Sequence, residues 1–110
     1  MRNLSAAQDG KTNAIIAHIT IIGTIIAFVL NNSSKNEFTS FYLRQMVGLH
    51  LLSFINEWFI RGYVSGVVSW AITALLVAFW FVSLIGAINE EEKLVPFLGE
   101  QFQDWFKGIR

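Results

Sequence analysis

The fold of this chain is constrained most by three long apolar segments, which take up the larger part of its 110 residues. They cover residues 14–30, 38–60 and 64–89. Segments of this length can cross the hydrocarbon core of a bilayer, roughly 30 Å thick, as helices that rise about 1.5 Å per residue. We therefore predict an all-α membrane protein, a single domain over residues 1–110, with three transmembrane helices arranged up-down-up.

The composition supports a lipid environment. Hydrophobic residues make up 54% of the chain, charged residues 15%, and the mean hydropathy is +0.50. A soluble domain of this size needs a larger polar share to cover its surface. Eight Lys and Arg balance eight Asp and Glu without a basic run, so nucleic acid is not an expected partner. The absence of cysteine excludes disulfides, thiolate nucleophiles and cysteine-based metal sites.

The first apolar segment, residues 14–30, contains no formal charge and a single histidine, His18. Asn31 and Asn32 follow it and predict its end. A cleaved signal peptide is the competing interpretation, because such peptides also carry a short apolar run. No A-x-A-like site follows, and two more apolar segments do, so we predict a retained helix.

Capping and turn signals predict where the second helix begins and ends. Ser34–Glu37 has the pattern of a capping box, which begins this helix near Lys35. Arg61 and Gly62 form a tight turn after it, so the second and third helices should be antiparallel neighbours. Three aromatic residues near the start are placed where interfacial aromatics usually lie. They are Phe38, Phe41 and Tyr42.

Small residues recur every four positions in the first half of the third helix, continue near its other end, and predict a packing stripe. Small side chains let helix backbones approach closely in lipid. We expect this stripe to be a seam within the chain, with homodimerisation as the alternative. Its members are Ser65, Ser69, Thr73 and Gly86.

The tail, residues 96–108, predicts an amphipathic helix with Pro96 in its first turn. It is too short and too polar to span a bilayer, so it should lie in the membrane interface. Docking onto a partner protein is the alternative. One apolar stripe follows helical spacing: Leu98, Phe102, Trp105, Phe106 and Ile109.

The second segment carries unusual polarity for a membrane span. Polar groups that face lipid without a partner cost several kcal/mol, so this face should point into the protein. Matching depths along antiparallel helices predict that His18 pairs with Glu57, and that Arg44 pairs with Glu90 or Asn89. The alternative for Arg44 is snorkelling to lipid phosphates. The predicted intramembrane polar network consists of His18, Gln45, His50, Ser53, Asn56 and Glu57.

These polar residues do not form a recognisable catalytic, cofactor or metal site. Two histidines invite a bis-histidine haem, but the predicted depths are about 15 Å for His50 and about 6 Å for His18. No His-Glu-x-x-His pattern, phosphate-binding loop or Ser/His/Asp set is present. We therefore expect no enzyme activity, no cofactor and no bound metal.

Three stretches resemble a known family. AHITIIG in the first segment, F-x-x-F-Y-x-R-Q over Phe38–Gln45, and LIGAINEEEKLVPFLG over Leu84–Gly99 resemble a bacterial family of small membrane proteins. That family is distantly similar to the twenty-kilodalton import component of the chloroplast inner envelope, whose members have four spans where this chain has room for three. The family pattern falls on Ala17, His18, Phe38, Phe41, Tyr42, Arg44, Gln45, Gly86 and Pro96.

Together these features predict a non-enzymatic subunit of a larger membrane complex, and the resemblance implies a bacterial inner membrane and protein transport. The expected partners are the lipid bilayer and other membrane-protein subunits. One alternative is a homo-oligomeric transporter or channel whose path is lined by Gln45, His50, Ser53 and Glu57. Another is a scaffold that acts on the bilayer through its amphipathic tail.

Overall fold

A computed structural model describes residues 4–109 of the chain, and within them every regular element is helical. The prediction of an all-α protein is therefore confirmed. Helix η1 is a π-helix that continues α3 without a break. In chain order the helices are α1 (Leu4–Ile16), α2 (Thr20–Ser34), α3 (Glu37–Ile55), η1 (Asn56–Val64), α4 (Gly66–Ile88) and α5 (Gly99–Trp105).

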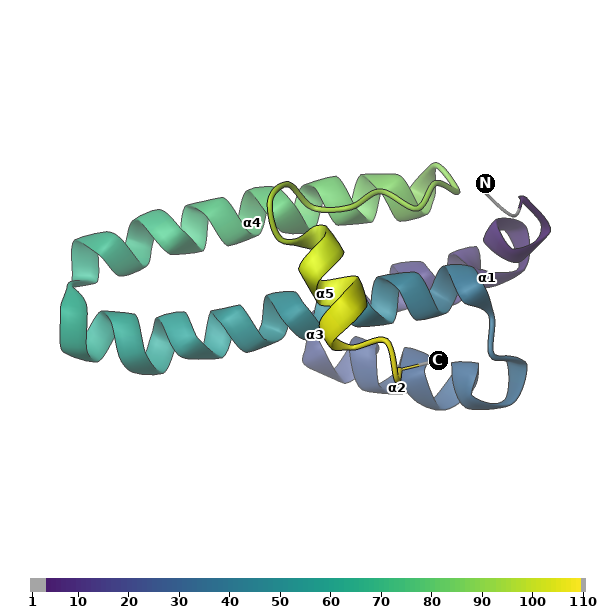
Figure 1. Cartoon of the computed structure of the whole chain (residues 1–110), viewed down its shortest axis with the longest axis horizontal. Helices are drawn as coiled ribbons and strands as arrows, with labels where there is room; N and C mark the ends of the chain where they lie inside the picture. Colours follow the sequence, from purple (N-terminus) through teal and green to yellow (C-terminus); the bar gives the residue numbers. More distant parts are fainter. Residues whose placement is uncertain (1–3, 110) are drawn as a thin grey trace.

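A long antiparallel hairpin of α3–η1 and α4 forms the axis of the molecule, which measures 45 × 23 × 22 Å (Figure 1). The chain reverses at Ser65, not at the predicted Arg61–Gly62 turn, which lies inside η1. The Ser65 hydroxyl accepts hydrogen bonds from the backbone N–H groups of Val67 (3.1 Å) and Val68 (3.4 Å). It thus caps α4, whose observed bounds differ from the predicted 64–89 by two residues or fewer.

The first predicted span is wrong, because residues 14–30 do not form one helix. Helix α1 ends at Ile16 and α2 begins at Thr20, which has a positive φ of 60°. Gly23 lies so close to the Ile16 carbonyl that no side chain would fit there. The two helices form a short hairpin beside half of α3, visible in purple and blue in Figure 1.

Both ends of the α1–α2 hairpin lie at the same end of the molecule. Asn36, which follows α2, donates from Nδ2 to the backbone oxygen of Ala6 in α1 (3.0 Å). Asn36 is also the N-cap of α3, since its side chain accepts from the Thr39 N–H (3.0 Å). The capping-box pattern therefore located the beginning of α3 within two residues, although the capping residue is Asn36 and not Ser34.

Three spans are not supported by the helices as they form. Within residues 4–109, α4 is the one helix long and apolar enough to cross a membrane. Helix α2 is apolar but has 15 residues. Helix α3 carries too many polar side chains to be as apolar as α4.

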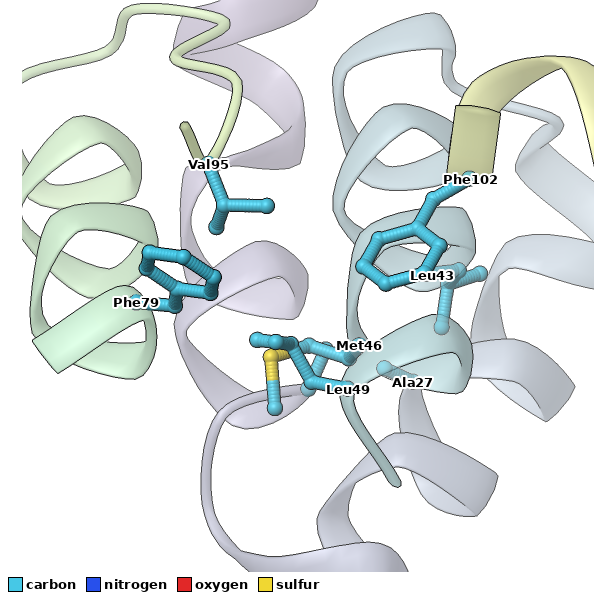
Figure 2. Close-up of a cluster of buried hydrophobic side chains, with 8 residues drawn as sticks. Ala27, Leu43, Met46, Leu49, Phe79, Val95 and Phe102 are labelled. Carbon is cyan, nitrogen blue, oxygen red and sulfur yellow. The ribbon is translucent and has the colours of Figure 1, made fainter. Parts of the chain in front are cut away.

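Side chains from α2, α3, α4, the tail and α5 meet in one apolar core (Figure 2). Phe102 of α5 lies against α3 where Gly48 leaves space, and a Cβ at Gly48 would overlap the phenyl ring. Close packing of this kind makes the core sensitive to single methyl groups. The buried members are Ala17, Ala27, Leu43, Met46, Leu49, Phe79, Val95 and Phe102.

The tail packs onto α3 and does not extend as the predicted interfacial helix over 96–108. After α4 it returns along the hairpin in a segment without helix, and α5 has only seven residues. Pro96 lies in a turn before α5. Of the predicted apolar stripe, Phe102 is buried and Trp105 is 63% exposed. Leu98, Phe106 and Ile109 are partly buried against the apolar core.

The three aromatic residues predicted at the membrane interface are buried inside the protein. Tyr42 packs against Phe38 and Phe41 with ring centroids 5.2 and 4.8 Å apart, both in edge-on arrangements. They form a second apolar cluster with alanines of α1 and α4, so they join α3 to the α1–α2 hairpin and to α4. These alanines are Ala7, Ala14 and Ala87.

Candidate functional site

A polar network lies where the tip of the α1–α2 hairpin meets α3 and α4. His18 Nε2 is 2.7 Å from the Ser83 hydroxyl, and Gln45 Nε2 donates to the same hydroxyl (2.8 Å). His18 Nδ1 lies 2.6 Å from the Ala14 carbonyl, which can only accept. The proton of His18 is therefore on Nδ1, and the Ser83 hydroxyl donates to Nε2. We name this set, His18, Gln45 and Ser83, the central network.

The Gln45 side chain also holds the tail, by hydrogen bonds to the tail's backbone. Its Oε1 accepts from the Val95 N–H (3.0 Å), and its Nε2 donates to the Lys93 carbonyl (3.0 Å). Tyr42 acts similarly one turn away: its hydroxyl donates to the Glu91 carbonyl and accepts from the Lys93 N–H (3.2 Å). Both side chains are 0% exposed. The Tyr42 and Gln45 side chains thus hold the returning tail by contacts that do not depend on its side chains.

Trp80 closes the tip of the hairpin from the side of α4. Its indole N–H donates to the His18 carbonyl (2.9 Å), a group left without a helical partner where α1 ends. The Thr24 hydroxyl donates to the carbonyl of Ala17 (2.6 Å), the residue before His18. The break in the first apolar segment is therefore stabilised by polar groups, of which Trp80 and Ser83 come from distant positions on α4.

His50 interacts with α2. Its Nε2 lies 2.8 Å from the Thr24 hydroxyl. Because the single Thr24 proton already goes to Ala17, His50 Nε2 is the donor. The sequence left the partner of His50 open, with Ser53, Trp70, Thr73 and water as the candidates, and Thr24 was not among them. The depth argument that separated His50 from His18 was also wrong, since Thr24 bonds both His50 and the backbone next to His18.

The predicted pairs are not formed. His18 is bonded to Ser83 and Ala14, whereas Glu57 forms an ion pair with Arg61 (3.4 Å) on the exposed side of η1. Within the described part of the chain, Arg44 is bonded to the tail and not to Asn89 or Glu90: its Nε donates to the Ile109 carbonyl (3.0 Å) and its Nη1 to Gln103 Oε1 (3.2 Å).

The predicted intramembrane network is divided into separate clusters. His18 and Gln45 meet at Ser83, and His50 bonds Thr24. Ser53 donates to the Leu49 carbonyl of its own helix (2.9 Å). The remaining two residues, Asn56 and Glu57, lie near the turn at Ser65.

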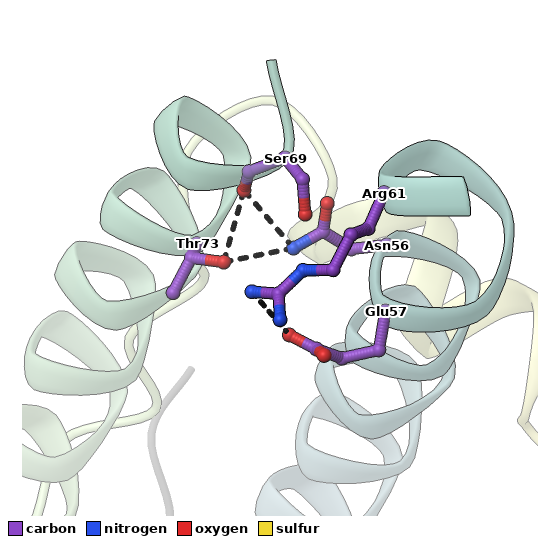
Figure 3. A network of polar contacts seen from close by, with 5 residues as sticks. All are labelled: Asn56, Glu57, Arg61, Ser69 and Thr73. Atoms are coloured by element: carbon purple, nitrogen blue, oxygen red, sulfur yellow. Dashed lines mark hydrogen bonds and ion pairs between the residues drawn. The ribbon is translucent and has the colours of Figure 1, made fainter. Parts of the chain in front are cut away.

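Asn56 joins η1 to α4 near the reversal of the chain (Figure 3). Its Nδ2 donates to the Ser69 carbonyl (3.2 Å) and the Thr73 hydroxyl (2.9 Å). Two buried atoms here, Asn56 Oδ1 and Ser69 Oγ, have no hydrogen-bond partner within residues 4–109. Beside them Arg61 stacks over the Trp70 ring, 5.8 Å from its centroid.

The predicted packing stripe lies in contacts within the chain. Ser69 and Thr73 face Asn56, and a Cβ at Gly86 would overlap the Tyr42 hydroxyl. Ser65 has a different role, as the N-cap of α4.

Two hollows open on the sides of α3, of about 260 and 460 Å³. His50, Ser53 and Glu57 line both. The first hollow lies against α4 and includes Trp80, and the second includes Trp58. These side chains place polar groups on an otherwise apolar lateral surface.

A third hollow, of about 620 Å³, lies at the end of the molecule away from Ser65. We name it the charged hollow, because three cations and two carboxylates line it together with Ser40, Phe41 and Gln103. The charged residues are Lys35, Glu37, Arg44, Glu92 and Lys107.

Residues 4–109 hold no group of three or more His, Cys, Asp or Glu placed to bind a metal ion. The polar side chains of the central network bond one another and the backbone. Their role in this arrangement is to position α1, α3, α4 and the tail. Sequence reasoning missed Thr24, Trp80 and the bridging role of Ser83, because isolated polar residues in apolar runs carry no local signal of their partners.

Comparison of the chain with models of protein families, with curated proteins and with solved structures finds no match.

Proposed function

We propose that the chain is an integral membrane protein whose α3–η1/α4 hairpin crosses the bilayer. The observation that carries this proposal is the polarity of α4. The stripe it buries contains Ser69, Ser83 and Gly86, while its exposed face is apolar. A helix with polar groups inside and apolar groups outside suits lipid and not water. Its exposed residues include Val67, Trp70, Leu75, Val77, Phe81, Ile85 and Ile88.

The two ends of the hairpin match the two surfaces of a bilayer. Near Ser65 the exposed side chains include Trp58, Tyr63 and Trp70, the aromatic residues typical of an interface. The opposite end carries the charged hollow and the acidic residues after α4. The 23 residues of α4 give about 35 Å of helix, enough for a hydrocarbon core of roughly 30 Å. Since one residue links η1 to α4, α3–η1 must cross with it.

The α1–α2 hairpin enters the bilayer and returns to the same surface in this arrangement. Its helices have 13 and 15 residues, or about 20 Å each, and its two ends lie together. Exposed isoleucines on α2 would contact lipid. They are Ile21, Ile22, Ile25 and Ile26.

The chain acts, in this proposal, as a non-enzymatic subunit of a larger assembly in the bacterial inner membrane. Ser53 and Glu57 are exposed on the lateral surface, where Ser53 bonds its own helix and Glu57 has Arg61 as its one described partner. Lipid offers such groups no further hydrogen-bond partners. A neighbouring membrane protein supplies such partners. The resemblance of the Phe38–Gln45 and Leu84–Gly99 stretches suggests protein transport as the pathway.

Labelling of single cysteines tests the topology, because the chain has no cysteine of its own. Cysteine replaces Gln8, Lys35, Gly62 or Glu90 in turn, and sealed membrane vesicles are treated with an impermeant maleimide. Positions 8, 35 and 90 should react from one side and position 62 from the other. Reaction of position 8 from the side of position 62 would show that the first apolar segment crosses. Removal of the protein by alkaline washing would overturn membrane integration.

Purification in mild detergent tests the role as a subunit. A membrane protein recovered at fixed stoichiometry with the tagged chain is the expected result. A pure homo-oligomer would contradict it and favour the second candidate, a small transporter.

The two lateral hollows are the observation that favours a transporter, since His50, Ser53 and Glu57 line both. In that case Glu57→Gln should change the flux of solute across the membrane of reconstituted vesicles, without lowering the thermal stability of the protein. Loss of stability without a change in flux would assign Glu57 a structural role.

A further inference from the structure

The charged hollow has a wall held in place by the tail. Arg44 is bonded to Gln103 and to the Ile109 carbonyl, and Gln103 in turn donates from Nε2 to the Phe41 carbonyl (2.8 Å). The guanidinium of Arg44 is therefore positioned by α3 and α5 together. A cation fixed in this way can recognise an anion with little loss of side-chain entropy.

The same hollow also carries two carboxylates, Glu37 and Glu92. Burial raises the pKa of Glu92, and the carboxylate of Glu37 raises it further, while Arg44 opposes the shift. Neither carboxylate forms an ion pair with a cation of residues 4–109. These carboxylates therefore favour a positive group, and the hollow as a whole presents both signs of charge to one space.

We propose that the charged hollow binds a phosphoethanolamine group. The phosphate lies toward Arg44, Lys35 and Lys107, and the ammonium donates hydrogen bonds to Glu37 and Glu92. The proposal that the group is the headgroup of a membrane lipid rests on the membrane topology proposed above, which places the hollow at a bilayer surface. Cationic pockets between helices at that depth bind lipid headgroups.

Other headgroups fit the lining less well. A purely anionic headgroup would face two carboxylates without any positive group to offer them. A quaternary ammonium cannot donate a hydrogen bond and is recognised by several aromatic faces, whereas Phe41 is the aromatic side chain that lines the hollow.

Lipid retention in native mass spectrometry tests the proposal. The full chain is purified in detergent micelles that contain phosphatidylethanolamine, phosphatidylglycerol or phosphatidylcholine with identical acyl chains. Retention of phosphatidylethanolamine should exceed that of the other two about fivefold, as one well-formed exposed ion pair allows. In the double variant Glu37→Gln/Glu92→Gln it should fall to the phosphatidylcholine level, while Glu100→Gln, on the outer face of α5, leaves it unchanged. Equal retention of the three lipids, or an unaffected double variant, would overturn the proposal.

A second variant and a soluble ligand distinguish failure of the site from failure of the membrane topology. If the double variant does not fold, as judged by circular dichroism, Lys35→Gln/Lys107→Gln tests the phosphate side and should lower phosphatidylethanolamine retention; unchanged retention refutes the site. Soluble glycerophosphoethanolamine added to lipid-free protein should raise the melting temperature. If it does so in a chain that cysteine labelling shows not to cross the bilayer, the site holds a soluble ligand and the topology fails. If the chain crosses but selects no lipid, the site alone fails.

Discussion

The two halves of the molecule differ in how completely their buried polar groups are hydrogen-bonded. One half contains the α1–α2 hairpin, and the other lies near Ser65. In the first half Gln45, His18 and Ser83 use their donors and acceptors on one another and on the backbone of α1 and the tail. In the second half Asn56 Oδ1 and Ser69 Oγ are buried without a partner within the described residues, in a seam of only two helices. A satisfied buried group contributes to stability, whereas an unsatisfied one costs desolvation free energy, so its removal should cost little.

The largest effect is expected for Gln45→Ala. The change removes three hydrogen bonds at once and leaves the Val95 N–H and the Lys93 carbonyl unpaired in a buried place. Unfolding in detergent, followed by circular dichroism, should show a loss of about 3–5 kcal/mol. The exposed Gln101→Ala should stay within about 0.5 kcal/mol. Equal effects of the two changes would contradict the role of Gln45 in holding the tail.

Replacing a glycine by alanine in each half should change the stability of the protein by different amounts. Gly48→Ala places its Cβ against the buried Phe102 ring, and such overpacking costs about 1–3 kcal/mol. Gly62→Ala near Ser65 meets no atom within 4 Å, so it should be neutral or stabilise by up to about 1 kcal/mol. The same unfolding measurement compares them. A neutral Gly48→Ala would show that α5 does not lie on α3.

Two serines of α4, both 0% exposed, compare the halves directly. Ser83→Ala removes the hydroxyl that joins His18 to Gln45 and should cost about 1–3 kcal/mol. Ser69→Ala removes a hydroxyl with no described partner and should cost less than about 0.5 kcal/mol or stabilise the protein. If the two variants melt at the same temperature, the distinction between the halves is wrong.

The smallest effect concerns Glu92 and depends on pH. Its pKa is raised from 4.5 in the folded protein, so the folded state holds the proton more tightly than the unfolded chain does. The stability that this proton contributes is present at low pH and is lost as pH rises through the raised pKa. Glu92→Gln should therefore raise the melting temperature at pH 7, and the difference should vanish below pH 4.5. A difference independent of pH would exclude this cause.

The sequence was sufficient for elements whose causes are local. The apolar run that became α4 was predicted with bounds that differ by at most two residues, because its length and composition are decisive. The beginning of α3 was predicted from residues 34–37, where a polar cap precedes a long apolar stretch.

The missed turns share a physical cause. Thr20, at the break in the first apolar segment, and Phe97, in the tail, adopt positive φ values of 60° and 69°, and no glycine of the described part does so. A residue with a side chain pays about 1–2 kcal/mol for this conformation, so glycine is the usual signal for it. These turns are maintained by tertiary contacts, which sequence patterns do not contain.

The candidate site was predicted in its membership more than in its geometry. His18 and Gln45 were identified because polar residues in apolar runs are conspicuous. Their shared partner, Ser83, lies 65 residues from His18 in the chain. The wrong pairing with Glu57 followed from treating residues 14–30 as a single helix, which placed His18 at the wrong depth.

The bonds at the tip of the first hairpin also set an order in time. A ribosome makes His18 long before Trp80 and Ser83, the two side chains from α4 that complete its environment. Until α4 has left the ribosome, the His18 carbonyl and ring lack these partners. The part of the protein that is made first is thus among the last to reach its final structure.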